Sequence, residues 1–333
     1  MYLHARVVSV ALGIALVYSG GCRSNPTPTA APTTQPQEAT LRSYEYRQIH
    51  MGVQARLVVY AADEQTAIEA CRAAYHRIAQ LDDIMSDYRP ASELMRLCAK
   101  AGGDPVPVSP ELFLVLQKSE EMARKSNGAF DITIGPLIKL WRQARKNGQL
   151  PAEEDLRQAK ALVGWNKIKL DPQNRTAQLL VPGMKLDLGG IAKGYACDEA
   201  IAVLRERGIT RAVCEMGGDI VVSDPPPGKP GWVIEVTNDL PGHQSRKILV
   251  KNSGVSTSGD TEQFVIINGK RYSHIVDPRT GLGLTERSLV TIVGEKGLIT
   301  DALSTAVSIL GPERGRALAK SYNARAYIRL PEE

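Results

Sequence analysis

The sequence predicts an α+β fold with largely antiparallel sheets. Two observations predict it: amphipathic helical segments with apolar residues at three- and four-residue steps, and runs of short apolar stretches of strand length that follow one another directly. The composition agrees, because 43% hydrophobic and 23% charged residues in a chain of 333 are typical of a globular protein. Long disorder, collagen and multi-span membrane classes are thereby excluded.

Residues 1–22 are expected to form a signal peptide. The apolar run from Val7 to Tyr18 has about 12 residues, whereas a membrane-spanning helix needs about 20. It ends in Ser19-Gly20-Gly21-Cys22, which resembles a bacterial lipoprotein cleavage site, although Ser19 stands where an aliphatic residue is usual. We expect export to the periplasmic face of a bacterial membrane with a lipid anchor at Cys22. Plain secretion and a buried N-terminal helix are the alternatives.

The next segment, residues 23–43, is expected to be a disordered tether. Four prolines stand among Thr, Ala and Gln, a composition that cannot bury a core. The rest, residues 44–330, is expected to be one globular domain.

The first half of that domain carries a predicted strand and two predicted helices. Residues 53–59 alternate apolar and polar side chains, which is typical of a half-buried strand. Apolar residues recur at helical steps over 63–85 and again over 110–125. Ser109 before Pro110 is a typical helix start.

The second half is predicted to be rich in strands. Asp171 to Asn174 separates two apolar stretches, 167–170 and 176–181, as in a hairpin. A helix is expected after Gly189-Gly190, and a last helix over 300–310. Further strands are expected at 212–214, 220–222, 232–236, 264–267, 289–293 and 324–328.

Charge and cysteine usage exclude two kinds of site. The formal net charge is +5, but the basic residues are scattered and aromatics make up only 5%, so a nucleic-acid groove is not expected. The cysteines form no C-x-x-C pair, and zinc binding is improbable. Buried free thiols are expected at Cys71, Cys98, Cys197 and Cys214, with one disulfide as the alternative.

One candidate for chemistry is the turn from a predicted strand into a helix at Asp187 to Tyr195. Its Gly189-Gly190 pair lets the backbone approach a ligand closely, and a helix N-terminus presents free N–H groups to an anion. Lys193 is placed to neutralise a phosphate. The spacing is neither a Walker motif nor a Rossmann fingerprint, so tight packing and a solvent-exposed lysine remain the alternative.

Two further segments carry candidate groups. Asp301 and Thr305 are four residues apart, hence on one helix face, and their oxygens suit Mg²⁺; a helix cap by Thr300 or Asp301 is the alternative. His274 lies in a dense polar motif and is a candidate general base. Asp277 before Pro278 is equally compatible with turn chemistry.

Seven segments, in this order, resemble the ApbE family of flavin transferases over nearly all of residues 44–330. They are Met51-Gly52, Met85 to Tyr88 followed by Ser92 to Leu94, Asn127 to Pro136, Asp187 to Tyr195, Met216 to Asp219, Ser273 to Gly281 and Asp301 to Thr305. The resemblance implies the fold of that family, with FAD in a cleft between two halves. It implies that the enzyme uses FAD and Mg²⁺, moves FMN onto a Thr hydroxyl of a partner protein and releases AMP.

The resemblance also implies roles for individual residues. His274 is the candidate base, and Asp277 is expected to orient its loop. The expected metal ligands are Asp301 and Thr305 through side chains, with backbone oxygen from Gly190 and Ser304. The expected FAD-binding residues are Met51, Tyr88, Ala129, Phe130, Asp131, Asp187, Lys193 and Ile275.

The sequence departs from the family pattern at Asp219, where an Asn is frequent, and carries no good copy of the acceptor signature. The acceptor is therefore expected to be another protein, such as a membrane redox subunit. Two alternatives stay open: an Mg²⁺-dependent FAD pyrophosphatase, in which water replaces the Thr hydroxyl, and a flavin-binding lipoprotein without chemistry.

Overall fold

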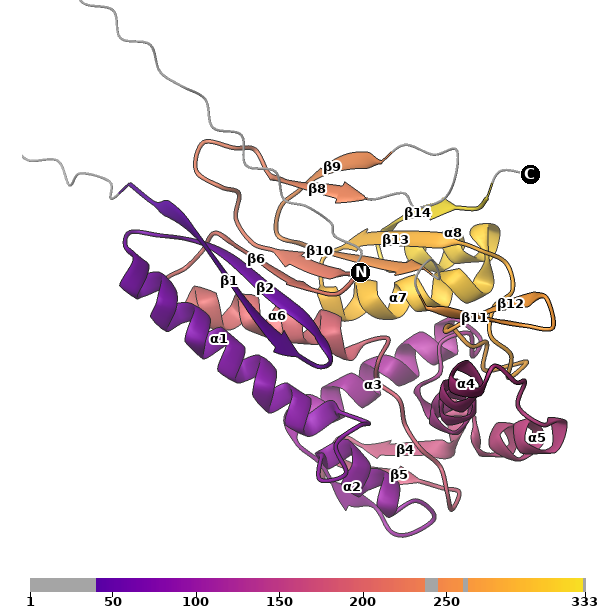
Figure 1. Cartoon of the computed structure of the whole chain (residues 1–333). Coiled ribbons are helices and arrows are strands. Elements are labelled where there is room, and N and C mark those ends of the chain that lie inside the picture. The colour runs from indigo at the N-terminus through magenta and orange to yellow at the C-terminus, as the bar shows by residue number, and fades with distance from the viewer. Residues whose placement is uncertain (1–39, 237–244, 260–262, 332–333) are drawn as a thin grey trace, which may run out of the picture.

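The core of the structure is a seven-stranded sheet in which every neighbouring pair is antiparallel (Figure 1). The computed structural model describes residues 40–236, 245–259 and 263–331. The α+β prediction with largely antiparallel sheets is confirmed. In spatial order the strands are β1 (Arg42–His50), β2 (Val53–Ala61), β6 (Ala212–Met216), β7 (Asp219–Val222), β10 (Ser253–Gly259), β13 (Leu289–Gly294) and β14 (Arg325–Arg329).

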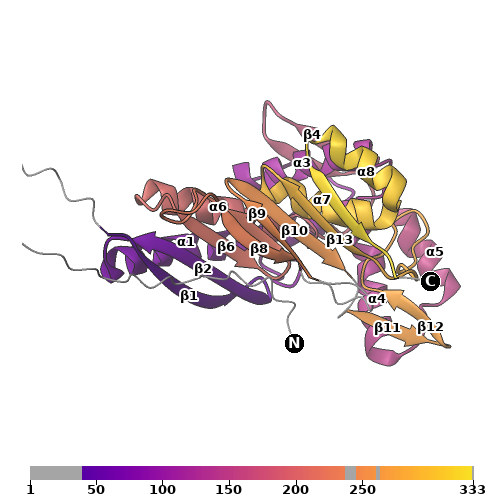
Figure 2. The ribbon, with the colours of Figure 1, turned by 90° about the horizontal axis from the view of Figure 1, so that it is seen from above.

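Helices cover one face of this sheet (Figures 1 and 2). The alternation in β2 shows how the faces are divided: Leu57 and Val59 pack into the core shared with the helices, whereas Val58 belongs to a separate cluster on the other face. The covering helices are α1 (Glu64–Met85), α6 (Ala192–Glu206), α7 (Gly297–Leu310) and α8 (Pro312–Ser321).

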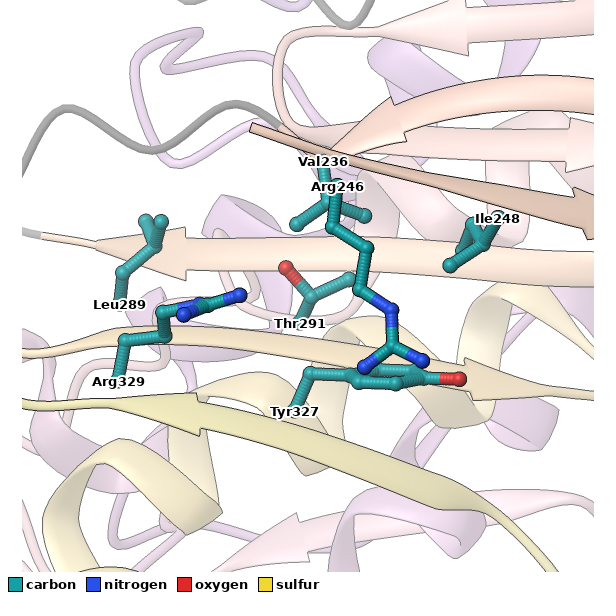
Figure 3. A pocket seen from close by; sticks show the side chains of 7 residues that line it. All are labelled: Val236, Arg246, Ile248, Leu289, Thr291, Tyr327 and Arg329. Carbon is teal, nitrogen blue, oxygen red and sulfur yellow. The ribbon is translucent and has the colours of Figure 1, made fainter. Parts of the chain in front are cut away.

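A two-stranded hairpin, β8 (Trp232–Val236) with β9 (Arg246–Val250), covers part of the opposite face. Its edge encloses a cavity of about 10 Å³, in which the Arg246 guanidinium lies 5.3 Å from the centre of the Tyr327 ring (Figure 3). That volume holds about one water molecule, so this cavity is no site for a small-molecule ligand.

A smaller unit lies beyond one end of the helical layer. A three-stranded sheet of β3 (Val106–Pro107), β5 (Thr176–Leu179) and β4 (Ile168–Asp171) packs with α2 (Glu93–Ala99) and α3 (Pro110–Lys125). Helix α4 (Gly135–Asn147) packs through Trp141 against the hairpin of β11 (Phe264–Ile267) and β12 (Lys270–Ser273). The remaining helices are η1 (Ile132–Ile134), α5 (Glu153–Leu162) and η2 (Trp165–Lys167).

Two helices begin where the sequence predicts, and each start is capped by a local side chain. The Asp63 carboxylate accepts a hydrogen bond from Thr66 N at the start of α1, and the Ser109 hydroxyl accepts one from Leu112 N at the start of α3. Helix α7, in contrast, begins at Gly297, three residues before the expected start. Thr300 and Asp301 therefore lie inside the helix, and the alternative that one of them caps it is wrong.

The N-terminal expectations lie mostly outside the described residues, including the signal peptide, Cys22 and the tether up to residue 39. Strand β1 begins at Arg42, so the last two residues of the range expected as tether belong to the sheet. Among the described residues, no helix combines the length and apolar character of a membrane span. Four cysteines, Cys71, Cys98, Cys197 and Cys214, are buried free thiols as expected.

Helices α6 and α7 touch backbone to backbone at Gly194 and Gly297. A Cβ added at Gly194 would lie 2.1 Å from the Gly297 carbonyl oxygen and 2.8 Å from Asp301 Cβ. One turn after Gly194 in α6, the Asp198 carboxylate accepts hydrogen bonds of 2.9 Å from the backbone N–H groups of Gly297 and Leu298. Asp198 thus caps α7 from a neighbouring helix, in place of a local side chain.

We expect Gly194→Ala to destabilise the fold by about 2–3 kcal/mol, because the added methyl group overlaps backbone atoms that cannot rotate away. The gain in helix propensity of about 1 kcal/mol is too small to compensate. Urea unfolding measures the change. Ala202→Ser, on the exposed side of α6, is the control and should stay within about 0.5 kcal/mol of wild type. Equal midpoints for Gly194→Ala and wild type would contradict the contact.

Candidate active site

A buried cluster of two carboxylates and one ammonium lies where α6 crosses α7. Lys193 Nζ is 3.2 Å from Asp219 Oδ2 and 3.5 Å from Asp301 Oδ2, and it donates a hydrogen bond of 2.8 Å to the Gly189 carbonyl. Asp301 and Asp219 are 4% exposed. Gly194 N donates to Asp301 Oδ2 at 3.0 Å, which fixes the carboxylate and leaves Oδ1 without a hydrogen bond in the described part of the chain.

Asp219 enters this cluster through a tight turn between β6 and β7. Gly217 has a φ of 62°, which a residue with a side chain rarely adopts. A Cβ on Gly218 would lie 2.5 Å from the Thr257 carbonyl oxygen, so only glycine fits there. The resemblance singled out this turn, where Asp219 stands in place of a frequent Asn, but sequence reasoning did not place Asp219 in the site.

Three more of the predicted residues meet beside the cluster. A Cβ added at Gly190 would lie 3.0 Å from Thr305 Oγ1 and 3.4 Å from Phe130 Cε2, so the Gly190 backbone is close to both side chains. Thr305 and Asp301 lie on the same face of α7, with Thr305 one helical turn after Asp301. The Ser304 hydroxyl donates to the Asp301 carbonyl at 2.8 Å, while the Ser304 carbonyl accepts a bond from Ser308.

The electrostatics of the cluster favour a further cation. Burial and the charge of Asp219 raise the pKa of Asp301 to about 7, although Lys193 and Gly194 N act in the opposite direction. Among the described residues, no three His, Cys, Asp or Glu side chains form a metal cage. One carboxylate, one hydroxyl and backbone oxygen suit Mg²⁺, which binds few protein ligands and retains waters, so the donor set fits this ion.

Asp187 links this cluster to an exposed aromatic ring. Its Oδ1 accepts a bond of 2.8 Å from Gly189 N, and its Oδ2 accepts one of 3.0 Å from Arg142. Arg142 also binds Asp87 at 2.5 Å and lies 4.3 Å from the centre of the Tyr88 ring. Burial and the charge of Asp87 raise the pKa of Asp187. Sequence reasoning missed Arg142, because nothing in its local pattern marks a residue whose partners lie 45 and 55 positions away.

Tyr88 also borders an open groove. Tyr88 is 74% exposed. The groove encloses about 660 Å³, which is within the range of small-molecule sites. Its lining residues are Asp83, Ile84, Tyr88, Arg89, Pro90, Ala91, Ser92, Glu93 and Arg96.

His274 follows β12 and is held in one tautomer. Its Nδ1 lies 3.1 Å from the Gln263 carbonyl oxygen, and since a carbonyl only accepts, the proton is on Nδ1 and Nε2 carries the lone pair. The pKa of His274 is lowered to about 4, chiefly by burial and in part by the charges of Arg145, Lys193 and Arg271. At neutral pH the imidazole is therefore uncharged and able to accept a proton at Nε2.

Asp277 is engaged in its own loop. Arg279 binds it through Nε and Nη2, and Arg279 N donates to Asp277 Oδ1 at 2.9 Å. The Asp277 carbonyl accepts from Gly281 N, and the Gly281 carbonyl accepts from Trp141 Nε1 at 2.8 Å. These contacts favour an orienting role for Asp277 over direct proton transfer.

Asp131, like Asp277, is held by hydrogen bonds from neighbouring residues. Its Oδ1 accepts bonds from Thr133 N and Oγ1, and its Oδ2 accepts one of 2.9 Å from Trp165 N. Ala129 and Phe130 are buried just before it, and the Ile132 carbonyl accepts from Asp187 N. Direct contact of Asp131 with FAD stays a prediction.

The remaining two predicted residues lie at the edges of the site. Met51 has a φ of 48° in the two-residue turn between β1 and β2. A Cβ added at Gly217 would lie 3.7 Å from Val53 Cγ1 and 4.0 Å from Lys193 Cε, which places this hairpin end beside Lys193. Ile275 is buried next to His274 and donates its N–H to Ser273 Oγ at 3.1 Å.

Comparisons with known proteins show which family the chain resembles in sequence and in fold. The ApbE family matches residues 51–328. An FAD:protein FMN transferase of Klebsiella pneumoniae (strain 342) is 32% identical over 279 residues, which are 83% of this chain and 85% of that protein. One of Chlamydia muridarum is 34% identical over 68% of this chain and 72% of its own. The crystal structure of apo flavinyl transferase ApbE from Pseudomonas stutzeri is similar with a TM-score of 0.79 at 28% identity, covering 88% of this chain and 92% of that one.

The lowered pKa of His274 predicts how stability depends on pH. The unfolded chain takes up a proton at this imidazole near pH 6.5, but the folded chain does so only near pH 4. Stability is thus lost as pH falls from about 6.5 to 4, by about 3 kcal/mol from this group. We expect His274→Asn, whose amide can still donate to Gln263, to show a smaller loss in urea unfolding over this range. Parallel curves for the two proteins would contradict the assignment.

Proposed function

The chain belongs to the ApbE family, and on this basis we propose that it is an FAD:protein FMN transferase that uses Mg²⁺, attaches FMN to a Thr hydroxyl of its acceptor and releases AMP. The observation that carries the proposal is the buried cluster of Asp301, Asp219 and Lys193 beside Gly190 and Thr305. A reaction on a pyrophosphate needs cationic groups at the phosphates, and this cluster provides both an ammonium and oxygen donors for a cation.

In this proposal Asp301 and Thr305 would hold Mg²⁺ through their side chains, together with the backbone oxygen of Gly190. The Ser304 carbonyl, named with them by the resemblance, lies inside α7 and is engaged by the Ser308 hydroxyl. The bound ion would supply positive charge for the reacting and leaving phosphate oxygens. The raised pKa of Asp301 supports the assignment, because a buried carboxylate beside a second carboxylate is stabilised in its charged form by a cation. Lys193 contributes a second positive charge and keeps the two carboxylates close together.

His274 serves as the general base. Nε2 takes the proton of the acceptor hydroxyl while that oxygen forms a bond to the FMN-side phosphorus. The bond from this phosphorus to the bridging oxygen breaks, and its electron pair leaves with AMP. The bond from His274 Nδ1 to Gln263 keeps the lone pair of Nε2 available, while Asp277 and Arg279 hold the loop that follows.

The acceptor is another protein, for which a membrane redox subunit is our candidate. Its support is the absence of a good acceptor signature in the chain and the lipoprotein-like start at Cys22. The periplasmic face of a bacterial membrane, with a lipid anchor at Cys22, is the proposed location.

The deciding experiment incubates the protein with FAD, Mg²⁺ and a subunit that carries a target Thr, then determines the intact mass of that subunit. An added FMN together with free AMP supports the transferase. Free FMN and AMP with an unmodified subunit would instead favour an FAD pyrophosphatase. Bound but uncleaved FAD would favour a flavin-binding protein without chemistry.

We expect Asp301→Asn to lower the transfer rate at limiting Mg²⁺ at least about hundredfold, because the ion loses its only carboxylate ligand in this set. The measurement is the initial rate of acceptor modification over a Mg²⁺ titration. Glu313→Gln is the matched control, because it also removes one negative charge but at an exposed position of α8. A wild-type Mg²⁺ dependence in Asp301→Asn would remove the metal assignment.

We expect His274→Asn to lower the rate of FMN transfer by about 10²–10⁴-fold, because the base at Nε2 is lost while the bond to Gln263 is retained. FAD binding, followed by flavin fluorescence, should change little. His76→Asn, on the exposed face of α1, controls for a histidine substitution as such. Full activity of His274→Asn would show that another group accepts the proton.

A further inference from the structure

Two arginines of helix α4 face the site but differ in their partners. Arg142 and Arg145 are three residues apart and therefore share one side of the helix. Arg142 is held by Asp87 and Asp187 and lies against the Tyr88 ring. Arg145 is half-buried, and no hydrogen bond or ion pair joins it to the described part of the chain.

At 3.6 residues per turn, Arg145 lies between Trp141 and Arg142 around α4, and hence on the side of the helix between the hairpin that carries His274 and the Tyr88 ring. Trp141, one helical turn before Arg145, lies with its ring centre 5.2 Å from that of Tyr272, two residues before His274. Arg142, on the other side of Arg145, lies against Tyr88. In agreement, the charge of Arg145 contributes to the lowered pKa of His274, and burial and the charge of Arg142 lower the pKa of Arg145 itself.

A half-buried guanidinium without a counter-charge is costly, since it has given up part of its hydration without gaining an ion pair. Arg142 is already shared by two carboxylates and cannot take up a further anion without competing with them. No acceptor of the described residues engages the donors of Arg145, and the planar guanidinium suits two oxygens of one phosphate. The uncompensated charge between Tyr88 and His274 therefore marks a place for a phosphate.

We propose that Arg145 binds the FMN-side phosphate of FAD. This inference depends on the proposed function, which requires the phosphorus to lie within reach of a hydroxyl at His274. In FAD that phosphate follows directly after the flavin and its ribityl chain. We take the flavin to lie at the exposed face of Tyr88 and the FMN-side phosphorus, which is the reacting one, to lie near His274. Arg145, between Tyr88 and the hairpin of His274, is then placed to bind the free oxygens of that phosphate.

The test compares Arg145→Gln with wild type, both as full-length protein, in calorimetric titrations with FMN, riboflavin and ADP. Loss of a charge-assisted contact should raise the Kd for FMN about ten- to hundredfold. The Kd for riboflavin, which has no phosphate, should change less than about twofold. Arg145→Lys, which keeps the charge, should recover part of the affinity for FMN. Lys146→Gln, the neighbouring exposed residue of α4, should bind all three compounds like wild type.

Each other outcome overturns the inference. An equal loss for FMN and riboflavin would mean that Arg145 only maintains the shape of the site. A loss confined to ADP would assign Arg145 to the adenosine side, and an unchanged Kd for FMN would mean that it binds no phosphate. Because these titrations need no acceptor and no turnover, a failure of FMN transfer in the wild type would contradict the proposed function without affecting the binding result.

Discussion

The site depends on the contact between Gly194 of α6 and Gly297 of α7, where two helix backbones meet without side chains between them. With that approach, Lys193 of α6 and Asp301 of α7 lie at ion-pair distance. Gly194 N reaches the Asp301 carboxylate directly, and Asp198 fixes the start of α7 from the same helix. A larger residue at either glycine would separate the helices and thereby the charges that the chemistry needs.

From this crossing a chain of polar contacts extends toward the outer face of the site. Lys193 binds the Gly189 carbonyl, Gly189 N binds Asp187, and Asp187 binds Arg142, which lies against Tyr88. The helical layer over the large sheet is thereby connected to the smaller unit that contains α4. A ligand that spans both units would find a fixed aromatic ring at one end and a fixed cluster of charges at the other.

The charge states within the site are set by burial as much as by partners. Burial keeps His274 neutral by lowering its pKa, and it raises the pKa of Asp301, which favours the uptake of a cation there. Arg145, on the other hand, stays charged, and no residue that the structure describes pairs with it. The neutral imidazole of His274, the carboxylate of Asp301 and the guanidinium of Arg145 are the groups on which the proposed reaction of a phosphate ester with a hydroxyl depends.

The sequence by itself determined the α+β class, the helices with strong periodicity and local caps, and the placing of Asp301 and Thr305 on one helix face, because these follow from contacts within a few residues. Ordered family motifs also identified the elements around the site. Only the tertiary structure decided the start of α7, since its cap is supplied by Asp198, 99 residues away from Gly297. It also decided that, within the described segments, Arg142 is paired and Arg145 is not, because the carboxylates of Asp87 and Asp187, distant in sequence, bind only Arg142.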